Sequence, residues 1–452
     1  MAVRLEDIGK TVRETQYAVR GPIVARAANL EREGREIIYC NIGNPQSLGQ
    51  KPLTWIRQIL ALISYPDLLI TGKDLFPADV IEMAKYIIRQ SKYGFGAYTD
   101  SKGLRFIREA VANFIEKRDG ITADPETIYL TDGASKGVQA ILEIMISSPH
   151  DGIMVSIPQY PLYSATITMY GGRRVDYYLD EATGWKLTLG QLEEAYLKAG
   201  KEGIRVRAIC VINPGNPTGA VLDEKNIEMV INFARKHHLA ILADEVYQDN
   251  IYLSSDSFIS FAKVLEKHHI KDVSLFSFHS CSKGLLGECG IRGGYFECRN
   301  IPGDVLLEIT KMRSVSLCAN TVGQVTTFLM VSPPQPGKPS FDSYTKERSD
   351  ILESLRVRAR LVAEGLNQIP GITCQHVAGA MYAFPKITLP PGMTDDDYCM
   401  RLLEETGICV VPGSGFGQAP GTFHFRTTIL PPIQKIGEVI KKLAAFQLKV
   451  MR

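Results

Sequence analysis

Ser280-Cys-Ser-Lys-Gly-Leu-Leu-Gly-Glu-Cys-Gly-Ile-Arg292 is the stretch around which the rest of the chain is organised. It follows an apolar run, Val273–Phe278, whose length and composition predict a β-strand. Lys283 is therefore expected just beyond the end of a sheet strand. An amine held in a pocket at such a place can act as a nucleophile.

Polar side chains on both sides of Lys283 suggest what this nucleophile would attack. Ser280 and Ser282 precede the lysine, and Arg292 follows it after a glycine-rich turn. Together they suit a phosphorylated aldehyde: the lysine condenses with the carbonyl, while Ser280 and Arg292 bind the phosphate. Pyridoxal 5′-phosphate fits this description. Because Lys-Gly also occurs in ordinary surface turns, the rest of the chain has to decide.

The length and composition limit the alternatives. A chain of 452 residues predicts two or three domains, and a formal net charge of +2 gives no reason to expect nucleic acid or a membrane as a partner. The nine cysteines show no C-x-x-C spacing. That pattern argues against a disulfide framework or a metal site and favours a reducing compartment.

Targeting signals are not recognised in the sequence. No run of about 18 apolar residues is present, so no membrane span is predicted. The first residues carry early acidic side chains without an apolar signal core, and the last three are not a peroxisomal tripeptide. The expected location is the cytoplasm.

From about residue 128, short apolar strands alternate with helices. The helices are expected near Ser135–Ile146 and Glu224–His238. The predicted strands are Ile128–Leu130, Ile153–Ser156, Arg207–Ile212, Ala240–Ala243, Val273–Phe278 and Gly294–Phe296. This alternation is typical of a mostly parallel sheet that is covered on both faces. Such sheets bind ligands at the carboxyl ends of their strands, so the residues after each strand are the informative ones.

The segments after the first two strands offer a phosphate site and an aromatic ring. Ala134 and Ser135 begin a helix whose free amides could hold a phosphate, although an ordinary N-cap would look the same. Tyr160, in Pro158-Gln-Tyr-Pro-Leu-Tyr163, could cover a planar ring or simply pack in the core.

The segments after the next two strands offer an amide, a carboxylate and a phenol. Asn213-Pro-Gly-Asn-Pro-Thr-Gly219 is a dense turn that would fix the direction of the Asn216 amide. Asp244-Glu-Val-Tyr247 follows the fourth strand. The Asp244 carboxylate could simply cap a helix. A functional role would require a cation that faces it.

The amino-terminal part is expected to form an arm followed by helices. Tyr17–Pro22 interrupts the first helical pattern, and Ile23–Glu33 resumes it. Gly43 lies in the turn Asn41–Pro45, where glycine allows a close approach of the backbone. Amphipathic stretches follow around 55–62 and 78–90. Tyr98 then precedes a further helix, and by itself it could be an ordinary surface tyrosine.

Beyond Pro333-Pro-Gln-Pro336 the composition changes. A long charged helix is expected over about Ser343–Leu366, and a last helix from Ile433. Strands are predicted within 381–387, 408–411 and 422–430, and Gly413–Gly417 is predicted to be a turn. These elements suggest a small α+β domain. We therefore predict an amino-terminal segment, 1–95, which contributes to the small domain and to a dimer interface, a large domain, 96–335, and a small domain, 336–452.

Taken in order, these motifs resemble a known family. Asn213–Gly219, Asp244–Tyr247, Ser280–Lys283 and Arg292 are similar to the signature of fold-type I pyridoxal-phosphate aminotransferases. The resemblance runs from Tyr17 to Arg426. Four phrases look most like the alanine aminotransferase branch: Tyr17–Pro22, Asp100–Arg105, Pro158–Tyr163 and Gly287–Gly294. The resemblance implies an α/β fold, with a mostly parallel seven-stranded sheet in the large domain and a small α+β domain.

The resemblance also implies how the cofactor is held. Lys283 would bind it covalently and move a proton between the substrate and the cofactor. Asp244 would pair with the ring nitrogen, Tyr247 and Asn216 would bond the ring hydroxyl, and Tyr160 would stack on the ring. The phosphate would be bound by Ala134, Ser135, Ser280, Arg292 and, from the second subunit of a homodimer, Tyr98.

Substrate contacts and the reaction follow from the same resemblance. Arg426 would clamp the α-carboxylate, with Gly43, Asn216 and Tyr160 beside the substrate. Arg20 on the arm, with Tyr17 next to it, would bind the distal carboxylate of glutamate. The expected reaction is L-alanine plus 2-oxoglutarate giving pyruvate plus L-glutamate, without a metal.

Two kinds of alternative remain open. A glutamate:glyoxylate aminotransferase, or a broader amino-acid aminotransferase, would share nearly all these residues. A non-catalytic aminotransferase-like ligand sensor would carry a fused DNA-binding helix-turn-helix domain, and neither such a segment nor a basic patch is recognised in the sequence.

Overall fold

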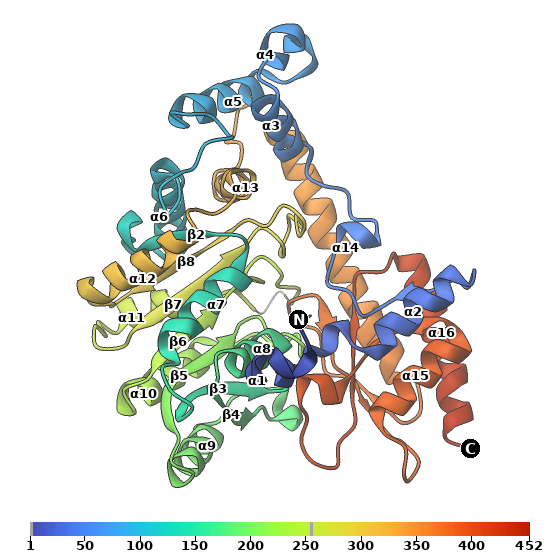
Figure 1. Ribbon diagram of the computed structural model, residues 1–452. Coiled ribbons are helices and arrows are strands. Elements are labelled where there is room, and N and C mark those ends of the chain that lie inside the picture. The colour runs from blue at the N-terminus through green and yellow to red at the C-terminus, as the bar shows by residue number, and fades with distance from the viewer. Residues whose placement is uncertain (1–2, 254–255) are drawn as a thin grey trace.

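The computed structural model describes residues 3–253 and 256–452. In that part of the chain, the largest sheet has seven strands in the order β2-β8-β7-β6-β5-β3-β4 (Figure 1). They are β2 (Ile128–Thr131), β3 (Asp151–Ile157), β4 (Arg173–Tyr178), β5 (Arg205–Ile212), β6 (Ala240–Asp244), β7 (Leu275–Ser280) and β8 (Gly294–Arg299). Strands β4, β3, β5, β6 and β7 run parallel, whereas β8 is antiparallel to both its neighbours. The predicted α/β fold with a mostly parallel sheet is confirmed.

Helices cover both faces of this sheet, which explains the continuous apolar strands. In β6, Leu242 points into a core shared with α7, α8 and α12, while Ile241 points into a core shared with α9, α10 and α11. Successive residues of a strand face opposite sides, so a strand covered twice must be apolar throughout. These helices are α7 (Ala134–Met145), α8 (Pro161–Met169), α9 (Leu189–Lys201), α10 (Glu224–Lys236), α11 (Phe261–Lys267) and α12 (Gly303–Val315).

Strand β4 was not predicted from the sequence. It is an edge strand with the sequence Arg-Arg-Val-Asp-Tyr-Tyr, in which only Val175 and Tyr177 are buried. An edge strand of this kind buries one face, so its apolar signal is short and is broken by charged residues.

A group of helices extends one end of the sheet. Helices α3 (Thr54–Ser64) and α5 (Ala78–Gln90), with the short α4 (Leu68–Thr71) between them, lie at the top of Figure 1. Their apolar faces pack in one core with α6 (Arg105–Asp119), α13 (Thr321–Val331) and strands β2 and β8. We call the sheet and all these helices the larger lobe.

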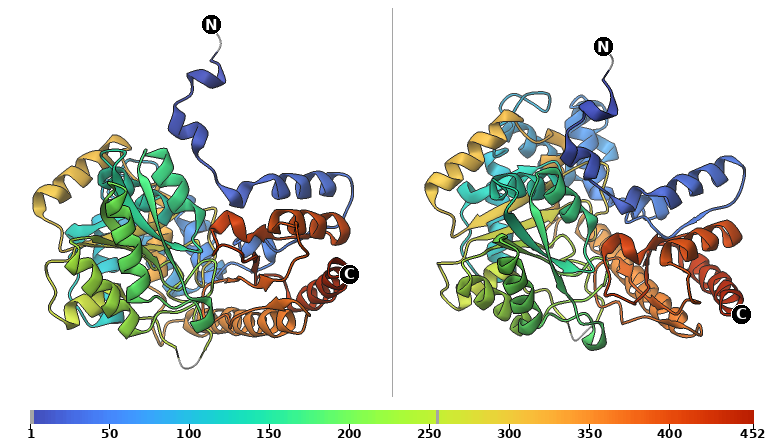
Figure 2. Two further views of the ribbon diagram at one scale, coloured as in Figure 1. Left: turned by 90° about the horizontal axis from the view of Figure 1, so that it is seen from below. Right: turned by 60° about the horizontal axis from the view of Figure 1, so that its bottom comes forward.

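The smaller lobe is built from both ends of the chain. Helix α14 (Phe341–Asn367) enters it, and α2 (Pro22–Arg32), α15 (Asp395–Thr406) and α16 (Ile433–Val450) share its core (Figures 1 and 2). β1 (Ile38–Tyr39) pairs with β12 (Ile408–Cys409), so backbone pairing joins the amino-terminal segment to the carboxyl-terminal one. The other short strands are β9 (Ile372–Thr373), β10 (Tyr382–Ala383), β11 (Lys386–Ile387), β13 (Val411–Pro412) and β14 (Phe425–Thr428). The boundaries at 95/96 and 335/336 stay predictions.

An arm precedes α2; its first residues extend away from the two lobes, as Figure 2 shows, whereas residues 10–14 lie beside α8. It contains α1 (Lys10–Glu14) and two 3-10 turns, η1 (Leu5–Asp7) and η2 (Ala18–Arg20). Another 3-10 turn, η7 (Gly413–Phe416), corresponds to the predicted turn and packs against η2.

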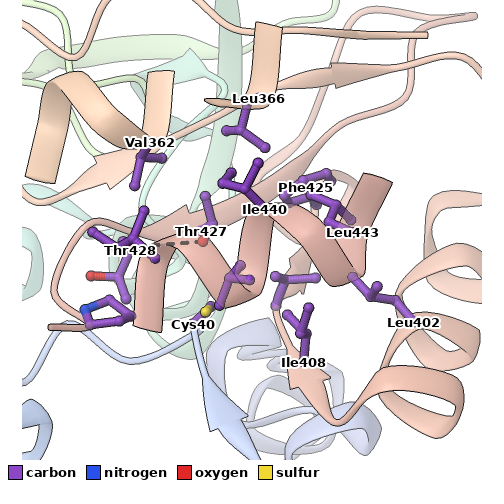
Figure 3. Close-up of a pocket in the computed structure, with 14 residues that line it drawn as sticks. Cys40, Val362, Leu366, Leu402, Ile408, Phe425, Thr427, Thr428, Ile440 and Leu443 are labelled. Carbon is purple, nitrogen blue, oxygen red and sulfur yellow. Dashed lines mark hydrogen bonds between the residues drawn. The ribbon is translucent and has the colours of Figure 1, made fainter. Parts of the chain in front are cut away.

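The core of the smaller lobe encloses a cavity of about 20 Å³ (Figure 3). Val362 and Leu366 of α14 and Ile440 and Leu443 of α16 line it. The Cys40 thiol also reaches it, and burial raises the pKa of that thiol to about 12. The cavity is a small packing gap among aliphatic side chains and offers no charged group for chemistry. No helix among residues 3–253 and 256–452 is long and apolar enough to cross a membrane.

Candidate active site

The carboxyl ends of neighbouring strands bring the predicted residues to one edge of the sheet. Asp244 is the last residue of β6, and Ser280 is the last residue of the adjacent β7. The turn that carries Asn216 follows β5, on the other side of β6. The parallel arrangement of these strands explains why residues so far apart in sequence become neighbours.

Lys283 lies against the smaller lobe. Its Nζ donates a hydrogen bond to the Gly43 carbonyl at 2.8 Å. A Cβ added to Gly43 would lie 1.7 Å from the Tyr382 phenol oxygen and 3.3 Å from Lys283 Nζ. Gly43, predicted to contact substrate, therefore has no room for a side chain beside the lysine.

Asp244 lies at the edge of the sheet and is buried, with 5% of its surface exposed. The Tyr163 hydroxyl donates to its Oδ2 at 3.0 Å, and the Val246 amide donates to Oδ1 at 3.4 Å. Burial raises the pKa of this carboxyl to about 6, although both hydrogen bonds oppose the shift. A buried carboxylate gains free energy when a cation faces it, so Asp244 fits the protonated ring nitrogen of pyridoxal phosphate.

Arg292 and the start of α7 form an anion cradle. Arg292 Nη1 donates to Ser282 Oγ at 3.2 Å, and Nη2 donates to the Asp132 carbonyl at 3.0 Å. A Cβ on Gly133 would be 2.4 Å from Arg292 Nη2, so glycine lets the guanidinium approach the helix. Ala134 and Ser135 are the first residues of α7. A guanidinium beside the free amides of a helix start suits a phosphate.

Ser280 is buried behind this cradle. Its hydroxyl donates to the Gly293 carbonyl at 3.1 Å and accepts from the Ser282 amide at 3.0 Å. In this arrangement Ser282, rather than Ser280, is the hydroxyl that contacts Arg292. The phosphate contact expected of Ser280 stays a prediction.

Arg426, on β14, is held in a fixed orientation. It is 1% exposed, and its guanidinium lies 4.2 Å from the ring centre of Tyr382 and 4.6 Å from that of Phe416. Nη1 donates to the Asn216 amide oxygen at 3.3 Å, and Nη2 donates to the Asn41 carbonyl at 2.7 Å. A guanidinium oriented in this way is suited to bind a carboxylate with two parallel hydrogen bonds.

The arm reaches the site through Tyr17. Its hydroxyl lies 2.9 Å from that of Tyr160, and the two rings meet edge to face. Burial raises the pKa of Tyr160 well above its ordinary value. Arg20, three residues after Tyr17, is exposed at the end of η2, so its contact with a distal carboxylate stays a prediction.

Tyr98 stands apart from the other predicted residues of its own chain. It is 76% exposed and lines a separate cavity of about 190 Å³ together with Lys92, Phe95 and Thr321. In the described residues, no hydrogen bond or ring contact joins Tyr98 to Lys283 or to the anion cradle.

Several residues of the site were not predicted from the sequence. Tyr163 was seen only as part of an aromatic phrase, and Asn41 only as part of a turn. Phe416 lies in the predicted turn, and Tyr382 lies in a segment, 381–387, that was predicted only to be a strand. Nothing in the local sequence of Tyr382 distinguishes it from a core residue, because its neighbours in the site come from distant segments. Its ring meets that of Tyr247 edge to face at 6.3 Å.

The fold and the site together define a class. A mostly parallel sheet that carries a lysine, a buried carboxylate and an arginine–helix cradle at one edge is arranged for a phosphorylated aldehyde cofactor. The sequence matches the family described as "Aminotransferase class I and II" over residues 70–443. The chain belongs to this family. Enzymes of this family and fold depend on pyridoxal phosphate.

Individual relatives agree with this assignment. The chain is 48% identical to a "Probable alanine aminotransferase, mitochondrial" of Dictyostelium discoideum, over 100% of this chain and 90% of the relative. It is also 48% identical to "Glutamate--glyoxylate aminotransferase 1" of Arabidopsis thaliana, over 98% and 96%. Among solved structures, an alanine aminotransferase from Pyrococcus furiosus matches with a TM-score of 0.81 and 27% identity, over 98% of this chain and 100% of that chain.

Proposed function

We propose that this chain transfers the amino group of L-alanine to 2-oxoglutarate, giving pyruvate and L-glutamate in two half-reactions. The observation that carries the proposal is the buried Arg426, oriented by Asn216 and by two aromatic rings, one of which, that of Tyr382, also lies near Lys283. A carboxylate receptor beside a lysine suits an α-amino acid. The similarity to alanine aminotransferases along the whole chain supports the choice of substrate.

The residues that would hold pyridoxal phosphate fit it by their chemistry. They are Lys283, Asp244, Asn216, Tyr247, Tyr160, Ser280, Arg292, Ala134 and Ser135. When bound, the cofactor supplies a cationic ring that withdraws electrons from the substrate α-carbon. The Asp244 carboxylate would hold the proton at the ring nitrogen, and burial strengthens that charge pair.

The remaining steps belong to the chain's own side chains. Arg426 would fix the α-carboxylate with two hydrogen bonds and so orient the α-hydrogen. Lys283 Nζ would then accept the α-proton and return it on the product side. Tyr247 and Asn216 would each hydrogen-bond the ring hydroxyl.

Other features belong to the same proposal. Arg20, with Tyr17, would bind the distal carboxylate of glutamate and 2-oxoglutarate. Two chains would form a homodimer in which Tyr98 completes the neighbouring site. A cytoplasmic location is proposed because each of the nine cysteines is free, as in a reducing compartment. Fractionation of the source cells tests this location, since some relatives are mitochondrial by name.

Glutamate:glyoxylate transamination is the second candidate. It is favoured by the Arabidopsis relative, which is as similar to this chain as the alanine aminotransferase of Dictyostelium. The two activities share an α-carboxylate and a distal carboxylate, so the same arginines would serve both.

A donor–acceptor screen of the purified protein distinguishes the two candidates. We expect alanine with 2-oxoglutarate to give the highest kcat/KM, and Lys283→Ala to abolish turnover while cofactor still binds noncovalently. Preference for glutamate with glyoxylate would establish the second candidate. Turnover that survives Lys283→Ala would refute both.

A further inference from the structure

The phenol oxygen of Tyr382 lies beside Gly43, whose carbonyl accepts the hydrogen bond of Lys283. Tyr382 begins β10 and is 3% exposed. Its ring covers the Arg426 guanidinium at 4.2 Å. Its ring meets that of Tyr247 edge to face, with the ring centres 6.3 Å apart.

The phenol oxygen and the lysine amine occupy the space that a side chain of residue 43 would fill. A Cβ on Gly43 would lie 1.7 Å from the phenol oxygen and 3.3 Å from Lys283 Nζ. The phenol oxygen and the lysine amine therefore both lie next to Gly43. They can do so because Gly43 has no side chain that would occupy this space.

The charged side chains that face this phenol are both positive. Lys283 and Arg426 are positive, and Tyr247, Tyr160 and the Cys289 thiol also interact with it. Burial opposes ionisation of Tyr382, but the two cations and Tyr247 outweigh it, so its pKa is lowered. Burial instead raises the pKa of Tyr160 and Tyr247 well above the ordinary value.

We propose that Tyr382 is a further catalytic residue, whose phenolate oxygen accepts a proton from the Lys283 ammonium and leaves the lysine as a neutral amine. One N–H bond breaks, one O–H bond forms, and the electron pair stays on nitrogen. The inference rests on the proposed function, because only a neutral lysine can attack a carbonyl or accept an α-proton.

A tyrosinate titration of the full-length, cofactor-free protein tests the inference. Absorbance near 295 nm is followed against pH in wild type and in Tyr382→Phe, which keeps the ring over Arg426. We expect wild type to show a tyrosinate that forms below the ordinary pKa of about 10. Tyr382→Phe should lose this step, and Lys283→Ala should move it up by about 1–3 pH units.

Two further variants test whether the titration step belongs to Tyr382 in its native position. Tyr398→Phe removes another fully buried tyrosine, whose hydroxyl donates to Gln447 of α16, and should keep the step. Gly43→Ala should displace the phenol and abolish the step although Tyr382 is still present. Circular dichroism checks that each variant is folded.

The outcomes separate this inference from the proposed function. The role of Tyr382 is overturned if no tyrosinate forms below the ordinary pKa in wild type, or if that tyrosinate still forms in Tyr382→Phe. The expected titration together with a wild type that forms no covalent link to pyridoxal phosphate would instead overturn the proposed function. As a second readout, Tyr382→Phe should capture pyridoxal phosphate about tenfold more slowly near neutral pH and recover at higher pH.

Discussion

Asp244 is a carboxylate whose charge costs free energy until a cation faces it. Its folded-state pKa of about 6 lies above the unfolded value of about 3.9. The free energy of unfolding is therefore highest, as far as Asp244 is concerned, below about pH 4, and it falls as the pH rises to about 6. Over that window the loss is at most roughly 3 kcal/mol.

Asp244→Asn should therefore stabilise the cofactor-free protein near pH 7.5 and give a much smaller gain near pH 4.5. The amide still accepts the Tyr163 hydrogen bond but carries no charge. Urea unfolding at the two pH values measures the difference, which we expect to be about 1–3 kcal/mol. The same variant should bind pyridoxal phosphate more weakly. Equal stabilities at pH 7.5 would mean that the charge of Asp244 is already compensated without cofactor.

Arg426 and Arg20, the residue predicted to bind the distal carboxylate, should differ in their effect on selectivity. Arg426→Ala should lower kcat/KM for every substrate by about 10²–10³-fold, because all carry an α-carboxylate and the site loses its buried cation. Arg20→Ala should lower kcat/KM for glutamate and 2-oxoglutarate far more than for alanine and pyruvate. Steady-state kinetics with all four compounds measure the contrast. Equal losses for both substrate classes would exclude Arg20 as the distal carboxylate receptor.

At the scale of elements, the arm and the turn η7 form one unit. A Cβ added to Gly415 would lie 2.5 Å from the Ala18 Cβ, so glycine lets η2 lie directly on η7. Phe416 on η7 packs on Arg426, and Tyr17 before η2 bonds Tyr160. The position of the arm is thus tied to both sides of the substrate site.

Gly415→Ala should loosen the arm without unfolding either lobe. The added methyl would push η2 away and break the Tyr17–Tyr160 contact. We expect faster tryptic cleavage after Arg20 and a severalfold higher KM, with little change in the melting temperature. Gly437→Ala, in α16 with open space around the glycine, is the matched control and should change neither. Unchanged cleavage in Gly415→Ala would show that the arm does not depend on this contact.

How much the sequence predicts also depends on the element. Strands β5, β6 and β7 were predicted because a strand covered on both faces is apolar throughout, and the polar residues after them mark the sheet edge. β4 was missed because it is an edge strand. Tyr382 and Asn41 were missed for another reason: their roles depend on contacts between segments hundreds of residues apart, which no local pattern records.

At the scale of the whole molecule, the site lies where the two lobes meet. Lys283 and Asp244 belong to the sheet edge, whereas Gly43 and Arg426 belong to segments that pack with the smaller lobe. The hydrogen bonds from Lys283 to Gly43 and from Arg426 to Asn216 cross between the lobes. A shift of one lobe against the other would therefore change the carboxylate receptor and the lysine together.

The last prediction is that Tyr98, which is exposed within its own chain, acts in the site of a second chain. It lies 76% exposed, on a surface with the exposed apolar residues Tyr93, Leu317 and Val322 near the start of α13. A two-fold dimer would bury such a surface and make both sites equivalent. We expect the Tyr98 hydroxyl to reach the anion cradle of the partner.

A mixed dimer tests this arrangement directly. A Tyr98→Phe chain is combined with a Lys283→Ala chain, and the heterodimer is isolated by two different affinity tags. If Tyr98 acts in the partner's site, both defects fall in one site, the other site is intact at both positions, and about half of the wild-type rate should return. If Tyr98 acts within its own chain, each site carries one defect and the rate stays at the level of the single variants. Homodimers of each variant are the controls, and sedimentation confirms the dimer. A monomer in solution, or no recovery in the heterodimer, would rule out the shared site.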